Sequence, residues 1–119
     1  MIKFIKIIFF ILANLYPLNA LADEKLKIGL LVPITGENKD LGKQIIKSTR
    51  IALKEINTEN LEIYLKDTNS DPSKTAKSAL ELKELGVKIV IGPVFFESLA
   101  YLNEIEDIIF LSFTNMTLD

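Results

Sequence analysis

The sequence predicts an α/β fold: a three-layer αβα domain around a parallel four-stranded sheet. Four short apolar runs alternate with three segments of helical periodicity, which gives the order βαβαβαβ. Strands and helices that alternate in this way favour a parallel sheet with right-handed crossovers and helices on both faces. The glycines and prolines fall between these segments, where the chain must turn.

The first 22 residues are expected to be a cleaved signal peptide and not part of the fold. Lys3 and Lys6 form a basic start, Ile7–Ala13 is an unbroken apolar run, and Ala20-Leu21-Ala22 fits the small-residue cleavage pattern. Polar residues and a proline interrupt the run well short of the ~20 apolar residues that a membrane span needs. We therefore expect the mature domain to be residues 23–119, with an uncleaved anchor as the alternative.

The first half of the mature chain predicts a strand, a helix and a second strand. Lys27–Val32 is a short apolar strand that Pro33 and Gly36 end. Apolar residues recur at helical spacing over Leu41–Asn57, with Asp40 as the expected N-cap. Leu61–Lys66 alternates in the manner of a strand with one apolar face.

The second half continues the alternation. Asp71-Pro72 predicts the start of a helix over Ser73–Leu85, which Gly86 ends. The third strand, Val87–Ile91, is nearly all β-branched, as is typical of a strand buried on both faces. A third helix is expected over Phe95–Glu106, and the fourth strand over Asp107–Ser112.

The fourth strand poses a physical problem because it is expected at the edge of the sheet. Its apolar residues, Ile108–Leu111, are poor edge residues, since a bare apolar edge invites pairing with another chain. We therefore expect a truncated chain or half of an ancestral lobe. The alternative is a compact four-stranded domain whose own tail covers the edge.

Composition excludes several classes of function. The mature chain would carry 12 basic and 16 acidic residues, a net charge of −4, which argues against a nucleic-acid or anionic-membrane partner. Contact with the membrane is expected only during export. The chain has no cysteine, so it can form no disulfide and carry no lipid-modified cysteine, and it has no histidine. The commonest metal ligand and general base are therefore absent.

The sequence lacks the complete motifs of nucleotide-binding and phospho-receiver proteins. Gly36–Gln44 resembles a phosphate-binding loop, but five residues separate its glycines in place of four, and Gln44 replaces the magnesium-binding Ser or Thr. No G-x-G-x-x-G turn follows the first strand, and Pro33 and Ile34 stand where a phospho-receiver needs an acidic pair. We expect a protein that is not an enzyme and has no cofactor or metal site.

Polar groups at the carboxyl ends of the predicted strands form the candidate binding site. The carboxyl ends of parallel strands meet at one edge of the sheet, where ligands of such folds bind. Hydroxyls and free amides at helix starts suit a carboxylate or another small anion, although each could be ordinary loop polarity or core packing. The candidates are Thr35, Gly36, Glu37, Phe96, Glu97, Ser98, Ser112 and Thr114.

Four blocks of the sequence carry a family resemblance. KIGLLVPITGENKDLG, KDTNSDPSKT, GVKIVIGPVFFES and IIFLSFTN resemble, in this order, the amino-terminal lobe of type I periplasmic binding proteins, the family of the leucine/isoleucine/valine-binding protein. The pairing of GPVF with LSFTN looks closest to the branch called penicillin-binding protein activators. The resemblance runs from about Lys27 to Asn115.

The resemblance implies a two-lobe protein that closes on a small ligand. It implies a partial amino-terminal lobe here, with ligand contacts at Gly36–Lys39, Phe96–Ser98, and Ser112 with Thr114, and with a structural role for Asp67. The expected function is periplasmic solute binding for an ABC-type uptake system, with an amino-acid-like ligand and an ABC permease as partner. The alternative is a regulator of cell-wall synthesis that contacts a synthase, and a third possibility is a remnant that needs the rest of its protein.

Overall fold

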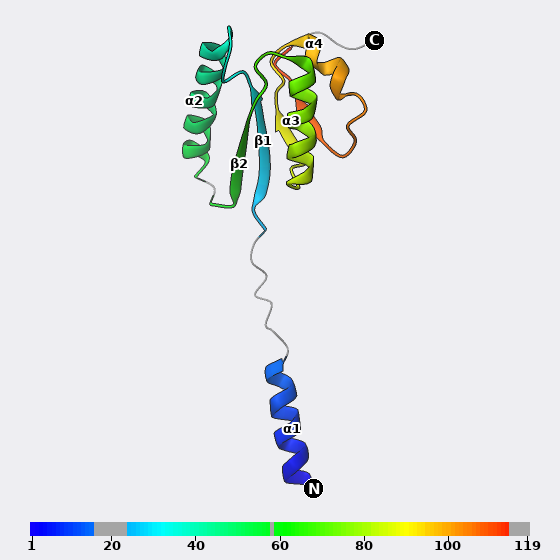
Figure 1. Ribbon diagram of the computed structural model, residues 1–119. Helices are drawn as coiled ribbons and strands as arrows, with labels where there is room; N and C mark the ends of the chain where they lie inside the picture. The colour runs from blue at the N-terminus through cyan, green and yellow to red at the C-terminus, as the bar shows by residue number, and fades with distance from the viewer. Residues whose placement is uncertain (16–23, 58, 115–119) are drawn as a thin grey trace.

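The structure is a computed structural model that describes residues 1–15, 24–57 and 59–114 (Figure 1). A helix, α1, covers Ile2–Leu15, and the remaining elements alternate between strand and helix. They are β1 Leu26–Val32, α2 Lys39–Ile56, β2 Leu61–Asp67, α3 Pro72–Glu84, β3 Ile89–Ile91, α4 Phe96–Leu99, the 3-10 helix η1 Ala100–Leu102, and β4 Ile109–Leu111.

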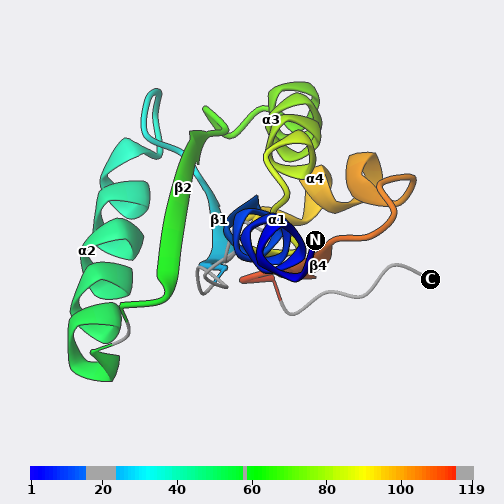
Figure 2. The same cartoon turned by 90° about the horizontal axis from the view of Figure 1, so that it is seen from below.

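The four strands form one parallel sheet in the order β2-β1-β3-β4. β1 lies in the middle, with Leu30 in register with Leu65 of β2 and with Ile91 of β3. This order requires each crossover to pass over a face of the sheet, and it places α2 on one face and α3 with α4 on the other (Figure 2). The predicted α/β architecture is therefore confirmed.

Alternation along β1 separates the two layers of side chains. Leu31 is fully buried in the core beneath α3 with Leu82, Val90 and Leu102. Leu82 packs directly over Gly29, where a side chain would collide with it. Leu30, one residue away, instead faces α2 and lines a cavity of about 230 Å³ between that helix and the sheet.

The α2 layer covers only half of its face of the sheet. α2 packs on β1, and side chains of β4 on the same face stay in solvent: Ile109 is 62% exposed and Leu111 is 53% exposed. Phe110, which points to the other face, packs against the core. The fourth strand thus lies at the edge of the sheet with two exposed apolar side chains. The tail that could cover this edge, residues 115–119, lies outside the described residues, so truncation stays a prediction.

This asymmetry predicts that threonine has little effect on stability at Ile109 and a large cost at Val90. Ile109→Thr should shift the free energy of unfolding by less than about 0.5 kcal/mol, because its side chain is exposed. Val90→Thr, on the neighbouring strand, should cost about 1–3 kcal/mol because it buries a hydroxyl in a fully apolar site. Urea unfolding of both variants measures the difference. A cost at Ile109 similar to that at Val90 would show that the face is covered in solution.

The third helix is much shorter than the sequence predicts. The expected Phe95–Glu106 helix ends at Leu99, continues as one 3-10 turn, and is followed by turns up to β4. Leu102 and Ile105 still reach the core, and Ile105 donates its N–H to the Leu102 carbonyl at 3.0 Å. The apolar spacing is therefore satisfied by successive turns, which periodicity alone does not distinguish from a continuous helix.

The structure corrects the predicted N-cap of α2 and confirms the predicted N-cap of α3. The N-cap of α2 is Asn38 and not Asp40, which lies in the first turn of the helix. Asp71 caps α3 as predicted, since its carboxylate accepts the Lys74 N–H at 2.6 Å and Pro72 follows it. Gly86 ends the segment in the left-handed region, with φ of 85°.

The expected export signal is only partly described. Lys3, Lys6 and the apolar run lie on α1, whose apolar residues Ile2, Phe4 and Phe10 are each more than 70% exposed. The cleavage motif at Ala20-Leu21-Ala22 lies outside the described residues. Among the helices that the structure describes, none combines the length and the apolar character that crossing a membrane requires.

Candidate functional site

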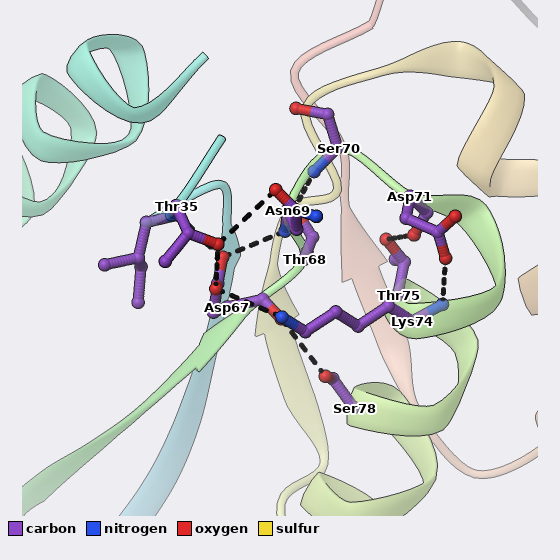
Figure 3. Close-up of polar contacts among 10 residues, drawn as sticks. Thr35, Asp67, Thr68, Asn69, Ser70, Asp71, Lys74, Thr75 and Ser78 are labelled. Carbon is purple, nitrogen blue, oxygen red and sulfur yellow. Dashed lines mark hydrogen bonds and ion pairs between the residues drawn. The ribbon is translucent and has the colours of Figure 1, made fainter. Parts of the chain in front are cut away.

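The loop after β1 is held against the end of β2 by one carboxylate (Figure 3). Asp67 Oδ2 accepts the Thr35 hydroxyl at 2.6 Å, and Asp67 Oδ1 accepts the Ile34 N–H at 2.8 Å and the Asn69 N–H at 2.9 Å. The ammonium of Lys74, from the first turns of α3, lies 3.2 Å from Oδ2. Asp67 therefore joins two loops and a helix at the carboxyl ends of β1 and β2.

These donors determine the charge state of Asp67. Burial by itself would raise the pKa of the carboxyl group, but the hydrogen bonds from Thr35, Ile34, Asn69 and Lys74 hold the pKa well below its usual range. Asp67 is thus a carboxylate throughout the physiological pH range. Its oxygens are occupied by the protein, which fits the structural role that the family resemblance implies.

Two further contacts fix the same loop. The Asn38 amide donates to Ser70 Oγ at 3.1 Å, which again ties the loop after β1 to the loop after β2. Gly36 has φ of 83°, and a side chain there would collide with the Asn69 amide oxygen. The backbone around Gly36 is therefore pre-organised and exposed, while Glu37 beside it extends into solvent.

The start of α4 contributes less to the surface than the sequence predicts. Ser98 is only 2% exposed, and its hydroxyl donates to Thr75 Oγ1 at 3.5 Å; Thr75 in turn donates to the Asp71 carbonyl at 2.7 Å. Phe96 is half-buried, and Glu97 is exposed. Of the three residues proposed here, Glu97 presents the most polar surface.

The end of β4 is joined to the end of β3. Ser112 Oγ donates to the Pro93 carbonyl at 3.2 Å and accepts the Thr114 N–H at 3.1 Å. The Phe113 N–H also donates to the Pro93 carbonyl, at 3.1 Å. This small turn places Ser112 and Thr114, both half-buried, beside the segment that leads into α4.

The structure thus brings the predicted residues to one rim of the sheet but in different roles. Gly36, Glu37 and Glu97 are exposed, whereas the hydroxyls of Thr35, Ser98 and Ser112 make hydrogen bonds inside the protein. Thr114 is half-buried beside Ser112. Sequence reasoning missed Asn69 and Lys74, whose polar segment directly follows β2. Within the described residues, no cluster of acidic side chains could hold a metal ion.

The family model for periplasmic binding proteins matches residues 25–117, nearly all of the sheet domain and its rim. The chain belongs to the periplasmic binding protein family. Family and fold are those of binding proteins, and the expected resemblance is confirmed.

Individual relatives cover only part of their own length. A Leu/Ile/Val-binding protein homologue of Brucella abortus is 37% identical over 71 residues, 55% of this chain and 19% of the relative. The leucine binding protein LivK of Thermotoga maritima matches with a TM-score of 0.60 and 28% identity, over 64% of this chain and 23% of that structure. This binding-protein chain therefore spans about a fifth of the relatives that it matches.

LpoA of Haemophilus influenzae has the same fold. Its structure matches with a TM-score of 0.62 and 23% identity, over 74% of this chain and 16% of that structure. At this identity the match supports a common fold only. The alternative of a cell-wall regulator therefore stays a prediction from the sequence.

Proposed function

We propose that the chain is the exported amino-terminal lobe of a periplasmic solute-binding protein of an ABC-type uptake system. The observation that carries this proposal is the family match over residues 25–117 together with accessible polar groups gathered on one rim of a parallel sheet. The relatives that are named for leucine, isoleucine and valine favour an amino-acid-like ligand.

The rim offers specific groups to such a ligand. The Ser112 hydroxyl donates to Pro93 and accepts from Thr114, which leaves one acceptor position for a ligand ammonium group. The exposed, pre-organised backbone at Gly36 can hydrogen-bond either end of an amino acid. Glu97 favours the ammonium end and disfavours the carboxylate end near α4. The lobe supplies these hydrogen-bonding groups from one side of the ligand only, since the family resemblance implies a second lobe that closes over it.

Ligand binding by this lobe alone is therefore expected to be weak. We expect a dissociation constant of about 1 mM or more for a branched-chain amino acid, which corresponds to only about 4 kcal/mol. Titration followed by amide NMR shifts should perturb Gly36, Ser112 and Thr114. Ser112→Ala should weaken binding by about threefold to tenfold through loss of one hydrogen bond, whereas Ser48→Ala on the exposed side of α2 should not.

Two results of this titration would contradict the proposed ligand site. Absence of shifts with all common amino acids would contradict ligand binding by this lobe. Shifts confined to α2 would contradict the rim as its site.

Export has a separate test. Expression of the full chain in a bacterial host should give a periplasmic product that begins at Asp23, because Ala20-Leu21-Ala22 precedes it. Mass spectrometry of the periplasmic and membrane fractions measures this. A product that retains Met1 and stays with the membrane would contradict cleavage without bearing on the ligand site.

A further inference from the structure

One side of α2 carries a continuous row of positive charge. Its members recur once per turn, at steps of four, four, three and four residues, and so share one side of the helix. They are Lys39, Lys43, Lys47, Arg50 and Lys54, five of the 12 basic residues of the mature chain, which we call the basic stripe. The charge is therefore strongly concentrated in a domain whose expected net charge is −4.

Among the acidic residues that the structure describes, only Asp40 forms an ion pair with the basic stripe. Asp40 is the only acidic residue between Lys39 and Lys54, and it lies 4.0 Å from Lys43 with 82% of its side chain exposed. By contrast, Lys66 pairs with Glu81 at 2.8 Å and Lys74 with Asp67 at 3.2 Å. Like charges one turn apart destabilise a helix by about 0.2–0.5 kcal/mol per pair, so the stripe costs stability in the free protein.

The stripe borders a groove with an apolar component. A groove of about 490 Å³ is lined by Lys43, Ile46, Lys47, Arg50, Ile51 and Lys54. The side chain of Ile51 is 51% exposed. A ligand that fills this groove needs anionic groups at its borders and an apolar group between them.

The setting of α2 favours a protein segment over a membrane surface. A helix that lies on a bilayer inserts its apolar face among the lipids. The apolar face of α2 is already used, since Gly42 lies against the Pro33 backbone and Leu53 lines the cavity over the sheet. The rest of the domain is acidic, which would repel an anionic bilayer.

We propose that the basic stripe and its groove bind an acidic segment of a partner protein. The segment carries Glu or Asp at one-turn spacing and a leucine-sized side chain that contacts Ile46 and Ile51. The groove residues, from Lys43 to Lys54, lie on the side of α2. Of the basic stripe only Lys39 adjoins the loop after β1, so changes at Lys47 and Arg50 test this docking surface separately from the proposed ligand site.

Fluorescence anisotropy with a labelled synthetic peptide tests the proposal. The probe is a helical peptide with Glu at positions i, i+4, i+8 and i+11 and leucines beside them, and the control probe has Gln in place of Glu. We expect the full chain to bind the Glu peptide alone, with affinity that falls as salt is raised. Lys47→Glu with Arg50→Glu should weaken binding at least about tenfold.

The control variant changes the same net charge elsewhere. Lys77→Glu with Lys88→Glu alters two exposed lysines outside α2 and should leave binding unchanged. Lys47→Gln with Arg50→Gln, checked by circular dichroism, replaces the charge reversal if that variant does not fold. Equal weakening by both charge-reversed pairs, or no binding of the Glu peptide, would overturn the proposal. Stronger binding to phosphatidylglycerol vesicles than to the peptide would also overturn it if Lys47→Glu with Arg50→Glu abolishes the vesicle binding, which separates the stripe from the apolar α1.

Discussion

Gly42→Ala should destabilise the domain strongly, although the substitution improves helix propensity. Alanine is favoured over glycine inside a helix by about 1 kcal/mol. At this position, however, a Cβ atom would overlap the carbonyl group of Pro33, which belongs to the backbone and not to a flexible side chain. Relief of the overlap requires α2 to move off the sheet or the end of β1 to shift.

The steric cost should exceed the propensity gain. Overpacking of a tight site costs about 1–3 kcal/mol and sometimes more, and each kcal/mol lowers the melting temperature of a domain of this size by about 4–8 °C. We expect a melting temperature lower by about 10 °C or more, measured by circular dichroism. Ser48→Ala, on the exposed side of the same helix, should instead raise it slightly. An unchanged melting temperature for Gly42→Ala would show that α2 does not contact Pro33.

The contrast between these two helix positions illustrates what the sequence can predict. Periodicity and the Asp71-Pro72 pair depend only on neighbours along the chain, so they predicted the alternation of strands and helices and the Asp71 cap correctly. Helix propensity identifies Gly42 only as a residue that weakens α2. The Pro33 carbonyl that makes glycine necessary there becomes visible only when α2 is packed on the sheet.

The candidate site, like the fold, could be predicted only in part from the sequence. Topology alone predicted that the ends of the strands meet at one rim, and the structure places Gly36, Ser112 and Thr114 there. It could not predict that the Thr35 hydroxyl would be used by a carboxylate 32 residues away, nor that Ser98 would be buried against α3. These hydrogen bonds depend on how the loops lie relative to one another in three dimensions, which the local sequence does not specify.

Asp67→Ala should be the most damaging polar substitution in the described chain. The carboxylate accepts hydrogen bonds from Ile34, Thr35 and Asn69, and it lies beside the Lys74 ammonium. Hydrogen bonds to a charged group contribute about 1.5–3 kcal/mol each, but they are not additive. We expect a loss of about 2–4 kcal/mol in urea unfolding, together with broadened NMR signals in the loop after β1.

Asp67→Asn separates the effect of charge from that of shape. The amide retains one acceptor oxygen for the Ile34 and Asn69 N–H groups, but its NH₂ group faces the Thr35 hydroxyl and the Lys74 ammonium. The loss should therefore be smaller than for alanine. Asp40→Asn is the matched control, because the Asp40 side chain is 82% exposed and should contribute little.

The pH dependence of stability identifies the carboxylate as the cause. The folded-state pKa of Asp67 lies below its unfolded value of about 4. The group therefore contributes its full stabilisation above that pH and loses it progressively as the pH falls toward the folded-state pKa. The difference in unfolding free energy between the wild type and Asp67→Asn should thus be constant near neutral pH and shrink below about pH 4. A difference that stays constant down to about pH 2 would mean that the loops after β1 and β2 are held by groups other than the Asp67 carboxylate.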